Sequence, residues 1–162
     1  MYLIKPTNKP SKKKLYLAYG SNLNVGQMKY RCPLARPVYS GVLADWKLVF
    51  RNVADIVEEQ GASVAVGIWE ITEQCEKALD AYEGYPTLYG KRTVELPNPT
   101  RDGTLTCMTY TMNRGAIGAP SLHYFATILQ GYRNFDLDVS SLAQARNHAI
   151  ENDSYQERFS FE

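Results

Sequence analysis

Two hydrophobic patterns alternate along the 162-residue chain and together predict its secondary structure. Short apolar or alternating runs predict five strands, at residues 15–19, 38–50, 63–71, 92–96 and 105–112. Apolar positions three or four residues apart predict four helices, at residues 22–31, 72–83, 120–132 and 139–152. The order β-α-β-β-α-β-β-α-α predicts one α+β domain around a mixed sheet.

The second predicted helix has the clearest boundaries. Thr72 is a typical N-cap residue, and Glu73 and Glu76 place carboxylates in the first turn, where the helix dipole favours them. Gly84 and Pro86 are expected to end the helix.

Two polar segments are expected to connect strands. Residues 52–61 contain Asp55, Glu58 and Glu59 and end in glycine, which predicts a loop. Residues 97–103, Pro-Asn-Pro-Thr-Arg-Asp-Gly, predict the turn of a hairpin.

Composition narrows the class of protein. A hydrophobic content of 44%, a charged content of 22% and a net charge of +1 favour one globular domain with no electrostatic bias toward nucleic acid or membranes. The three cysteines include no CxxC pair and only two histidines are present, which argues against a disulfide framework and a zinc site.

We expect residues 1–14 to form a flexible basic leader, 15–152 the domain and 153–162 a tail. The cysteine usage and the absence of an apolar run of signal-peptide or membrane-spanning length favour a cytoplasmic location.

The segment Tyr19-Gly20-Ser21-Asn22-Leu23 lies between the first predicted strand and the first predicted helix. A strand that breaks into Gly-Ser-Asn before a helix leaves backbone N–H groups pointing outward, and such a loop can hold an anion. We expect it to bind a substrate carboxylate through the main chain. The same residues are also ordinary turn formers, so the segment alone is not specific.

Glu83 is the candidate acid/base. It ends the second predicted helix, where the dipole disfavours a carboxylate, and neighbouring Tyr82 and Tyr85 would add desolvation that raises its pKa. The alternatives are that Glu83 is a solvated loop residue, or that Asp80, one turn earlier, takes its place. Asp80 is expected instead to accept local hydrogen bonds.

Other chemistries find little support in the sequence. Tyr89 and Tyr124 suit a pocket wall that also offers hydroxyl groups, although core tyrosines are an equal alternative. Neither a phosphate-binding Walker motif nor a Gly-x-Ser-x-Gly nucleophile motif is present. Cys75 lies on an apolar helix face, which favours a structural role.

Over roughly residues 15 to 135 the chain resembles the γ-glutamylcyclotransferase family (the AIG2-like or BtrG-like superfamily). The resemblance rests on the order and spacing of seven segments: residues 19–23 (Tyr-Gly-Ser-Asn-Leu), 31–41 (Arg-Cys-Pro to Gly), 46–50 (Trp-Lys-Leu-Val-Phe), 54–56 (Ala-Asp-Ile), 66–71 (Val-Gly-Ile-Trp-Glu-Ile), 79–84 (Leu-Asp-Ala-Tyr-Glu-Gly) with Tyr89, and 120–124 (Pro-Ser-Leu-His-Tyr) with Ile128 and Gly131.

The resemblance implies a small mixed β-barrel or sheet flanked by helices, with a pocket at the end of the first strand. It implies that Glu83 is the acid/base and that neither a metal nor an organic cofactor takes part. The expected partner is a small γ-glutamyl substrate, not nucleic acid or a membrane, and the protein is expected to be a monomer or homodimer. The substrate-binding residues that we expect are Tyr19, Gly20, Ser21, Asn22, Leu23, Tyr89 and Tyr124.

The implied reaction needs no nucleophile from the protein. The α-amine of a γ-glutamyl amide attacks its own γ-carbonyl, and Glu83 would move the proton from that amine to the leaving amine as 5-oxoproline forms. A non-catalytic protein that binds or senses an acidic small molecule on the same fold is the alternative. Asp55, Glu58 and Glu59 would suit a cationic leaving amine, although a solvated acidic loop is the simpler interpretation.

Overall fold

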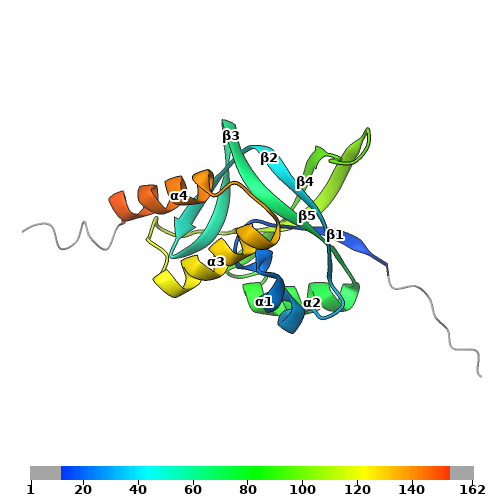
Figure 1. The fold of residues 1–162 in the computed structure, drawn as a ribbon. Coiled ribbons are helices and arrows are strands. Elements are labelled where there is room, and N and C mark those ends of the chain that lie inside the picture. The colour runs from blue at the N-terminus through cyan, green and yellow to red at the C-terminus, as the bar shows by residue number, and fades with distance from the viewer. Residues whose placement is uncertain (1–11, 154–162) are drawn as a thin grey trace, which may run out of the picture.

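Residues 12–153 of the chain are described by a computed structural model, and they form a mixed sheet flanked by helices (Figure 1). Parts of the predicted leader and tail, residues 1–11 and 154–162, lie outside the described residues. The strands are β1 (Lys14–Ala18), β2 (Arg36–Arg51), β3 (Val53–Ile71), β4 (Tyr89–Pro97) and β5 (Thr104–Met112). Their order in the sheet is β2-β3-β1-β5-β4, and β1 and β5 are parallel while the other neighbours are antiparallel.

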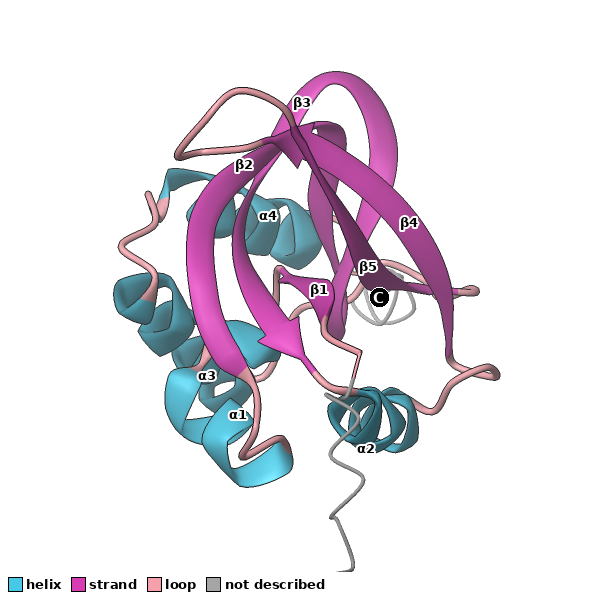
Figure 2. Ribbon diagram, turned by 90° about the vertical axis from the view of Figure 1, so that its right-hand side faces the viewer, coloured by secondary structure: helices cyan, strands magenta, loops and turns pink. Residues whose placement is uncertain are grey.

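The sheet curls strongly toward a barrel (Figure 2). A Cβ atom built on Gly41 of β2 would lie 3.2 Å from Leu96 Cδ1 of β4, so the two outer strands approach each other. The interior between them is filled by apolar side chains such as Leu43, Val66 and Leu105, all of which are buried.

The helices lie at one end and along one side of the curved sheet (Figures 1 and 2). They are the 3-10 helix η1 (Ser21–Leu23), α1 (Val25–Arg31), α2 (Glu73–Glu83), α3 (Leu122–Asn134) and α4 (Ser140–Glu151). The predicted α+β class and element order are therefore confirmed. The described part of the chain contains no helix that is both long enough and apolar enough to cross a membrane.

The predicted loop at residues 52–61 is wrong, because this segment belongs to the long strand β3. The hairpin turns within a single residue, Asn52, whose φ angle is 65°, and Val53 already pairs with Arg51. The glycine that suggested a loop belongs to an irregularity, where the Gly61 N–H donates to Asp45 Oδ1 at 2.9 Å. Exposed polar side chains on a paired strand therefore resembled a loop.

Helix α2 follows its predicted boundaries. The Thr72 hydroxyl accepts a hydrogen bond from the Cys75 N–H at 3.2 Å, and Gly84 closes the helix in the left-handed conformation with a φ angle of 65°. Cys75 and Leu79 are buried on its inner face, which confirms the structural position of Cys75. These contacts fix the end of the helix, where Glu83 lies.

Helix α3 holds η1 in place through an unusually close approach at Gly131. A Cβ atom at Gly131 would lie 2.6 Å from both the carbonyl carbon and the Cβ of Leu23, and 2.7 Å from the Asn24 nitrogen. Only glycine fits here, because the overlap would be with backbone that cannot rotate away.

We expect Gly131→Ala to lower the free energy of unfolding by about 1–3 kcal/mol through overpacking, despite the better helix propensity of alanine. Urea unfolding of the purified variant measures this change. The control is Gln130→Ala on the same helix, where the side chain is exposed and the effect should be below about 0.5 kcal/mol. Equal stability of the two variants would contradict the described packing of α3 on η1.

Candidate functional site

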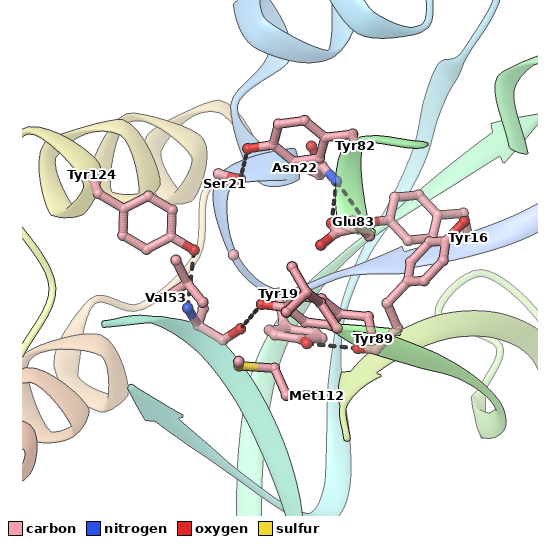
Figure 3. Close-up of a pocket in the computed structure, with 14 residues that line it drawn as sticks. Tyr16, Tyr19, Ser21, Asn22, Val53, Tyr82, Glu83, Tyr89, Met112 and Tyr124 are labelled. Atoms are coloured by element: carbon pink, nitrogen blue, oxygen red, sulfur yellow. Dashed lines mark hydrogen bonds between the residues drawn. The ribbon is translucent and has the colours of Figure 1, made fainter. Parts of the chain in front are cut away.

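A cavity of about 390 Å³ opens at the end of β1, where the chain turns into η1 (Figure 3). Its walls come from the loop after β1, the start of β3, the end of α2, both strands of the β4–β5 hairpin and α3. Of the 14 described residues that line it, Glu83 is the one with an ionisable carboxyl group, and six are tyrosines: Tyr16, Tyr19, Tyr82, Tyr89, Tyr110 and Tyr124.

The predicted loop forms one side of the cavity through Tyr19, Gly20, Ser21 and Asn22. The first hydrogen bond of η1 runs from the Leu23 N–H to the Gly20 carbonyl at 3.0 Å, so the N–H groups of Ser21 and Asn22 have no acceptor within this helix. Gly20 lies close to β3, because a Cβ atom there would lie 3.0 Å from Ala54 Cβ, which is a tight contact.

Leu23 takes a different place from the other residues of the loop. Its side chain is fully buried in the core, and it is not among the lining residues. Leu23 therefore anchors the loop against α3 from behind the cavity.

Asn22 connects the loop to Glu83. Its side-chain amide donates to Glu83 Oε1 at 3.2 Å and to the Tyr16 hydroxyl at 2.9 Å. Its backbone carbonyl accepts from the buried Trp69 indole N–H at 2.9 Å. Asn22 is itself buried, so its orientation is fixed from both ends.

Burial raises the pKa of Glu83 to about 7, against the opposing effects of the Arg31 charge and the Asn22 hydrogen bond. A carboxyl group with this pKa exchanges a proton readily near neutral pH, as a general acid/base must.

Arg31 supports Asn22 from outside the cavity. Its guanidinium donates to Asn22 Oδ1 at 2.7 Å and to Gln27 Oε1 at 2.6 Å, and it stacks 3.6 Å from the centre of the Tyr82 ring. Tyr82 in turn lies within hydrogen-bonding distance of the Ser21 hydroxyl, at 3.3 Å.

Tyr89 and Tyr124, the two tyrosines predicted for the wall, both line the cavity and both contact Ala54. The Tyr89 hydroxyl donates to the Ala54 carbonyl at 2.9 Å, and the Ala54 N–H donates to the Tyr124 hydroxyl at 3.0 Å (Figure 3). Burial raises the pKa of Tyr124 to about 12 and raises that of Tyr89 further, so both stay protonated at neutral pH. They fix the start of β3 against the loop.

Asp80 lies outside the cavity. Its carboxylate accepts from the Tyr110 hydroxyl and forms an ion pair with Lys91, Nζ to Oδ1, at 2.9 Å. As expected, it accepts hydrogen bonds from neighbouring side chains, and it ties α2 to the β4–β5 hairpin.

The site also contains residues that the sequence alone did not indicate, among them Tyr16, Arg31 and Tyr82. Tyr16 lies in β1, whose apolar pattern indicates burial and gives no sign that one of its side chains lines a cavity. Arg31 is one of many basic side chains, and only the return of α1 toward the loop brings it to Asn22. Tyr82 precedes Glu83 but was considered only as a source of desolvation.

The geometry is that of a small-molecule site with one carboxylate available for proton transfer. In the described part of the chain, no group of three or more His, Cys, Asp or Glu side chains could hold a metal ion. The protein is thus a small α+β domain in which a loop and one carboxyl group line the same cavity.

Comparison with known proteins specifies the family. The family model described as gamma-glutamyl cyclotransferase, AIG2-like, matches residues 16–137. Gamma-glutamylcyclotransferase from Mus musculus is 30% identical, over 91% of this chain and 84% of its own. The Homo sapiens protein of the same name is 29% identical, over 87% of this chain and 80% of its own.

Solved structures agree on the fold. A structure named gamma-glutamyl cyclotransferase superposes with a TM-score of 0.75 at 24% identity, over 83% of this chain and 87% of that chain. The human protein loc79017 superposes with a TM-score of 0.75 at 26% identity, over 83% of this chain and 86% of that chain. The chain belongs to the AIG2-like γ-glutamylcyclotransferase family.

The raised pKa of Glu83 predicts a pH-dependent stability. Between the unfolded value near 4.5 and the folded value of about 7, the folded protein binds more protons, so its stability falls as the pH rises through about 7. Glu83→Gln removes this titration. We expect it to match the wild type below about pH 4.5 and to be more stable by on the order of 1–3 kcal/mol above about pH 8. Urea unfolding across this pH range is the measurement, and a difference independent of pH would contradict it.

Loss of the Arg31 charge should raise the pKa of Glu83 above about 7, because the guanidinium favours the ionised carboxylate. A ¹³C NMR titration of the Glu83 carboxyl carbon in Arg31→Met measures this directly. Lys29→Met is the control, because it removes a charge from an exposed position of the same helix and should leave the titration unchanged. An unchanged Glu83 titration in Arg31→Met would show that the guanidinium does not act on the carboxylate.

Proposed function

We propose that the protein is a γ-glutamylcyclotransferase that releases 5-oxoproline from a γ-glutamyl amine, amino acid or peptide. The observation that carries the proposal is the position of Glu83, a cavity-lining carboxyl group with a pKa of about 7, beside the loop formed by Gly20, Ser21 and Asn22. Membership of the family supports the same reaction class.

The loop would hold the glutamyl group. The N–H groups of Ser21 and Asn22, which have no acceptor within η1, suit the α-carboxylate of the substrate. Because the glutamyl arm is flexible, fixing its carboxylate near Glu83 favours the folded-back conformer in which the α-amine faces the γ-carbonyl. Well-oriented ring closures of this kind reach effective molarities of about 10⁵–10⁸ M.

Glu83 would then move one proton. As a carboxylate it takes a proton from the α-amine, whose nitrogen forms a bond to the γ-carbon. As a carboxylic acid it gives that proton to the leaving nitrogen while the γ-carbon–nitrogen bond breaks. One group with a pKa near the working pH can do both steps, and such catalysis contributes roughly 10²–10⁴-fold.

Asn22 suits a role in keeping Glu83 in position during both steps. Its amide donates to Glu83 and to Tyr16, so it stabilises the ionised carboxylate without supplying a formal charge. A directly paired lysine or arginine would instead lower the pKa and weaken the acid form.

Replacement of Glu83 by Gln should lower the kcat for 5-oxoproline release by about 10²–10⁴-fold, because the proton carrier is lost while the shape of the side chain is kept. Release from γ-glutamyl-alanine, a γ-glutamyl amine and glutathione is followed by chromatography. The matched comparison is Asp80→Asn on the same helix, which removes a carboxylate outside the cavity and should cost less than about tenfold through loosened packing.

Three outcomes separate the possibilities. Loss in Glu83→Gln with retention in Asp80→Asn supports the proposed role. The reverse pattern would assign the acid/base role to Asp80. If the wild type binds γ-glutamyl compounds or 5-oxoproline without turnover, the protein is a binding or sensing protein on the same fold.

A further inference from the structure

The cavity has an apolar wall that the proposed chemistry does not use. Val53 at the start of β3, Leu88 in the α2–β4 connection and Met112 at the end of β5 all line it. Val53 and Met112 lie on the side of the cavity away from Asn22 and Tyr82 (Figure 3). Leu88 is 60% exposed, so part of this apolar wall is open to solvent. A bound molecule that extends from Glu83 toward the opening would meet this wall.

Among the residues that the structure describes, no basic side chain lines the cavity, so an anionic leaving group would have no charged partner among them. The exposed Arg114 follows the lining residue Met112 by two positions but is not itself a lining residue. Two other arginines close to the walls bind protein groups. Arg31 bonds Asn22 and Gln27, while Arg51 donates to Asp55 Oδ2 at 3.0 Å and to the Gly115 carbonyl at 2.6 Å.

The three acidic residues that suggested a cationic leaving group are also absent from the cavity. Asp55 is buried and both of its oxygens are used, by Arg51 and by the Met112 N–H at 2.9 Å. Glu58 pairs with Arg92 at 2.8 Å and Glu59 with Lys47 at 3.9 Å, on the exposed part of the β2–β3 hairpin. These three acids therefore offer no recognition site for a cation within the cavity.

We infer that Val53, Leu88 and Met112 form the leaving-group subsite, and that it selects γ-glutamyl amides of uncharged, apolar primary amines. This inference rests on the proposed function. A charged leaving group would lose water at this wall without gaining a partner, whereas an alkyl or aryl group would cover apolar surface that is now exposed.

The reaction of such a substrate is balanced without a further reactant. The α-nitrogen forms a bond to the γ-carbon, and the bond from the γ-carbon to the amine nitrogen breaks. One proton passes from the α-nitrogen to the leaving nitrogen through Glu83. The products are 5-oxoproline and the free alkyl or aryl amine.

Three γ-glutamyl amides of similar size test the inference. The leaving amines are propylamine, which is neutral and apolar, ethylenediamine, which is cationic at its far end, and glycine, which is anionic. We expect the kcat/KM of the propylamide to exceed that of each charged amide by about tenfold or more. A charged amide that is turned over as well as the propylamide, or better, would overturn the inference while the proposed function stands. No 5-oxoproline from any of the three would overturn the proposed function, and the inference with it.

Substitutions of Leu88 test whether the leaving group contacts this side chain. Leu88→Lys should shift the preference toward the glycine amide, and Leu88→Glu toward the ethylenediamine amide, each by about tenfold relative to the propylamide. Leu34→Lys is the matched control, because Leu34 is 64% exposed and lies outside the cavity. If Leu88→Lys leaves the ranking of the three amides as in the wild type, the leaving group does not occupy this wall and the inference fails.

Discussion

The site depends on how the side-chain amide of Asn22 is oriented. Its oxygen faces the Arg31 guanidinium at 2.7 Å, and its nitrogen therefore faces Glu83 and the Tyr16 hydroxyl. The opposite orientation would place N–H donors against a guanidinium that can only donate, and an oxygen against a carboxylate. Arg31 thus determines which way a neutral group points, and the Trp69 bond to the Asn22 carbonyl holds the backbone that carries it. The loop residues Gly20, Ser21 and Asn22 and the residue Glu83 line the same cavity.

Helix α2 carries two carboxyl groups whose surroundings shift their pKa values in opposite directions. Glu76 and Glu83 both lie on α2 and both lose solvent. Although burial opposes it, direct ion pairs with Lys14 and Lys91 lower the pKa of Glu76. At Glu83 burial outweighs the Arg31 charge and the Asn22 hydrogen bond and raises the pKa to about 7. The intervening amide gives Glu83 a hydrogen bond without a full ion pair. The raised pKa of Glu83 lowers the stability of the folded protein above neutral pH, where the buried carboxyl group is ionised. Shifted pKa values of this kind are common at functional sites.

Local signals predicted the parts of the fold that local interactions determine. The N-cap Thr72 and the left-handed Gly84 fix α2, so the position of Glu83 could be predicted from the sequence alone. The strand that begins at Val53 could not, because its polar side chains look like those of a loop until β2 pairs with residues 53–58. Asp55, which the sequence places in a solvated loop, is instead buried on the paired strand, where it accepts a hydrogen bond from Arg51.

The candidate site likewise combines residues that a local motif predicts with residues that only tertiary packing brings together. Gly20, Ser21 and Asn22 share one short segment, and their common position was predictable, whereas Arg31 and Tyr16 reach Asn22 only through tertiary packing. Leu23 shows that adjacency in a motif does not imply a shared surface, because the turn of η1 directs its side chain into the core beside Gly131.

The cavity separates the groups that hold a proton from those that meet the rest of a bound molecule. Asn22, Tyr16 and Arg31 form one hydrogen-bonded unit around Glu83, and none of their side-chain bonds involves Val53, Leu88 or Met112. Substitutions in the apolar wall can therefore change its shape or charge while the Asn22 amide keeps its orientation. A cation introduced near Glu83 would be the exception, because the low dielectric of the cavity transmits its field to the carboxylate. Under the proposed function, this separation would let the same acid/base arrangement serve different leaving groups, provided that new charges are added away from Glu83.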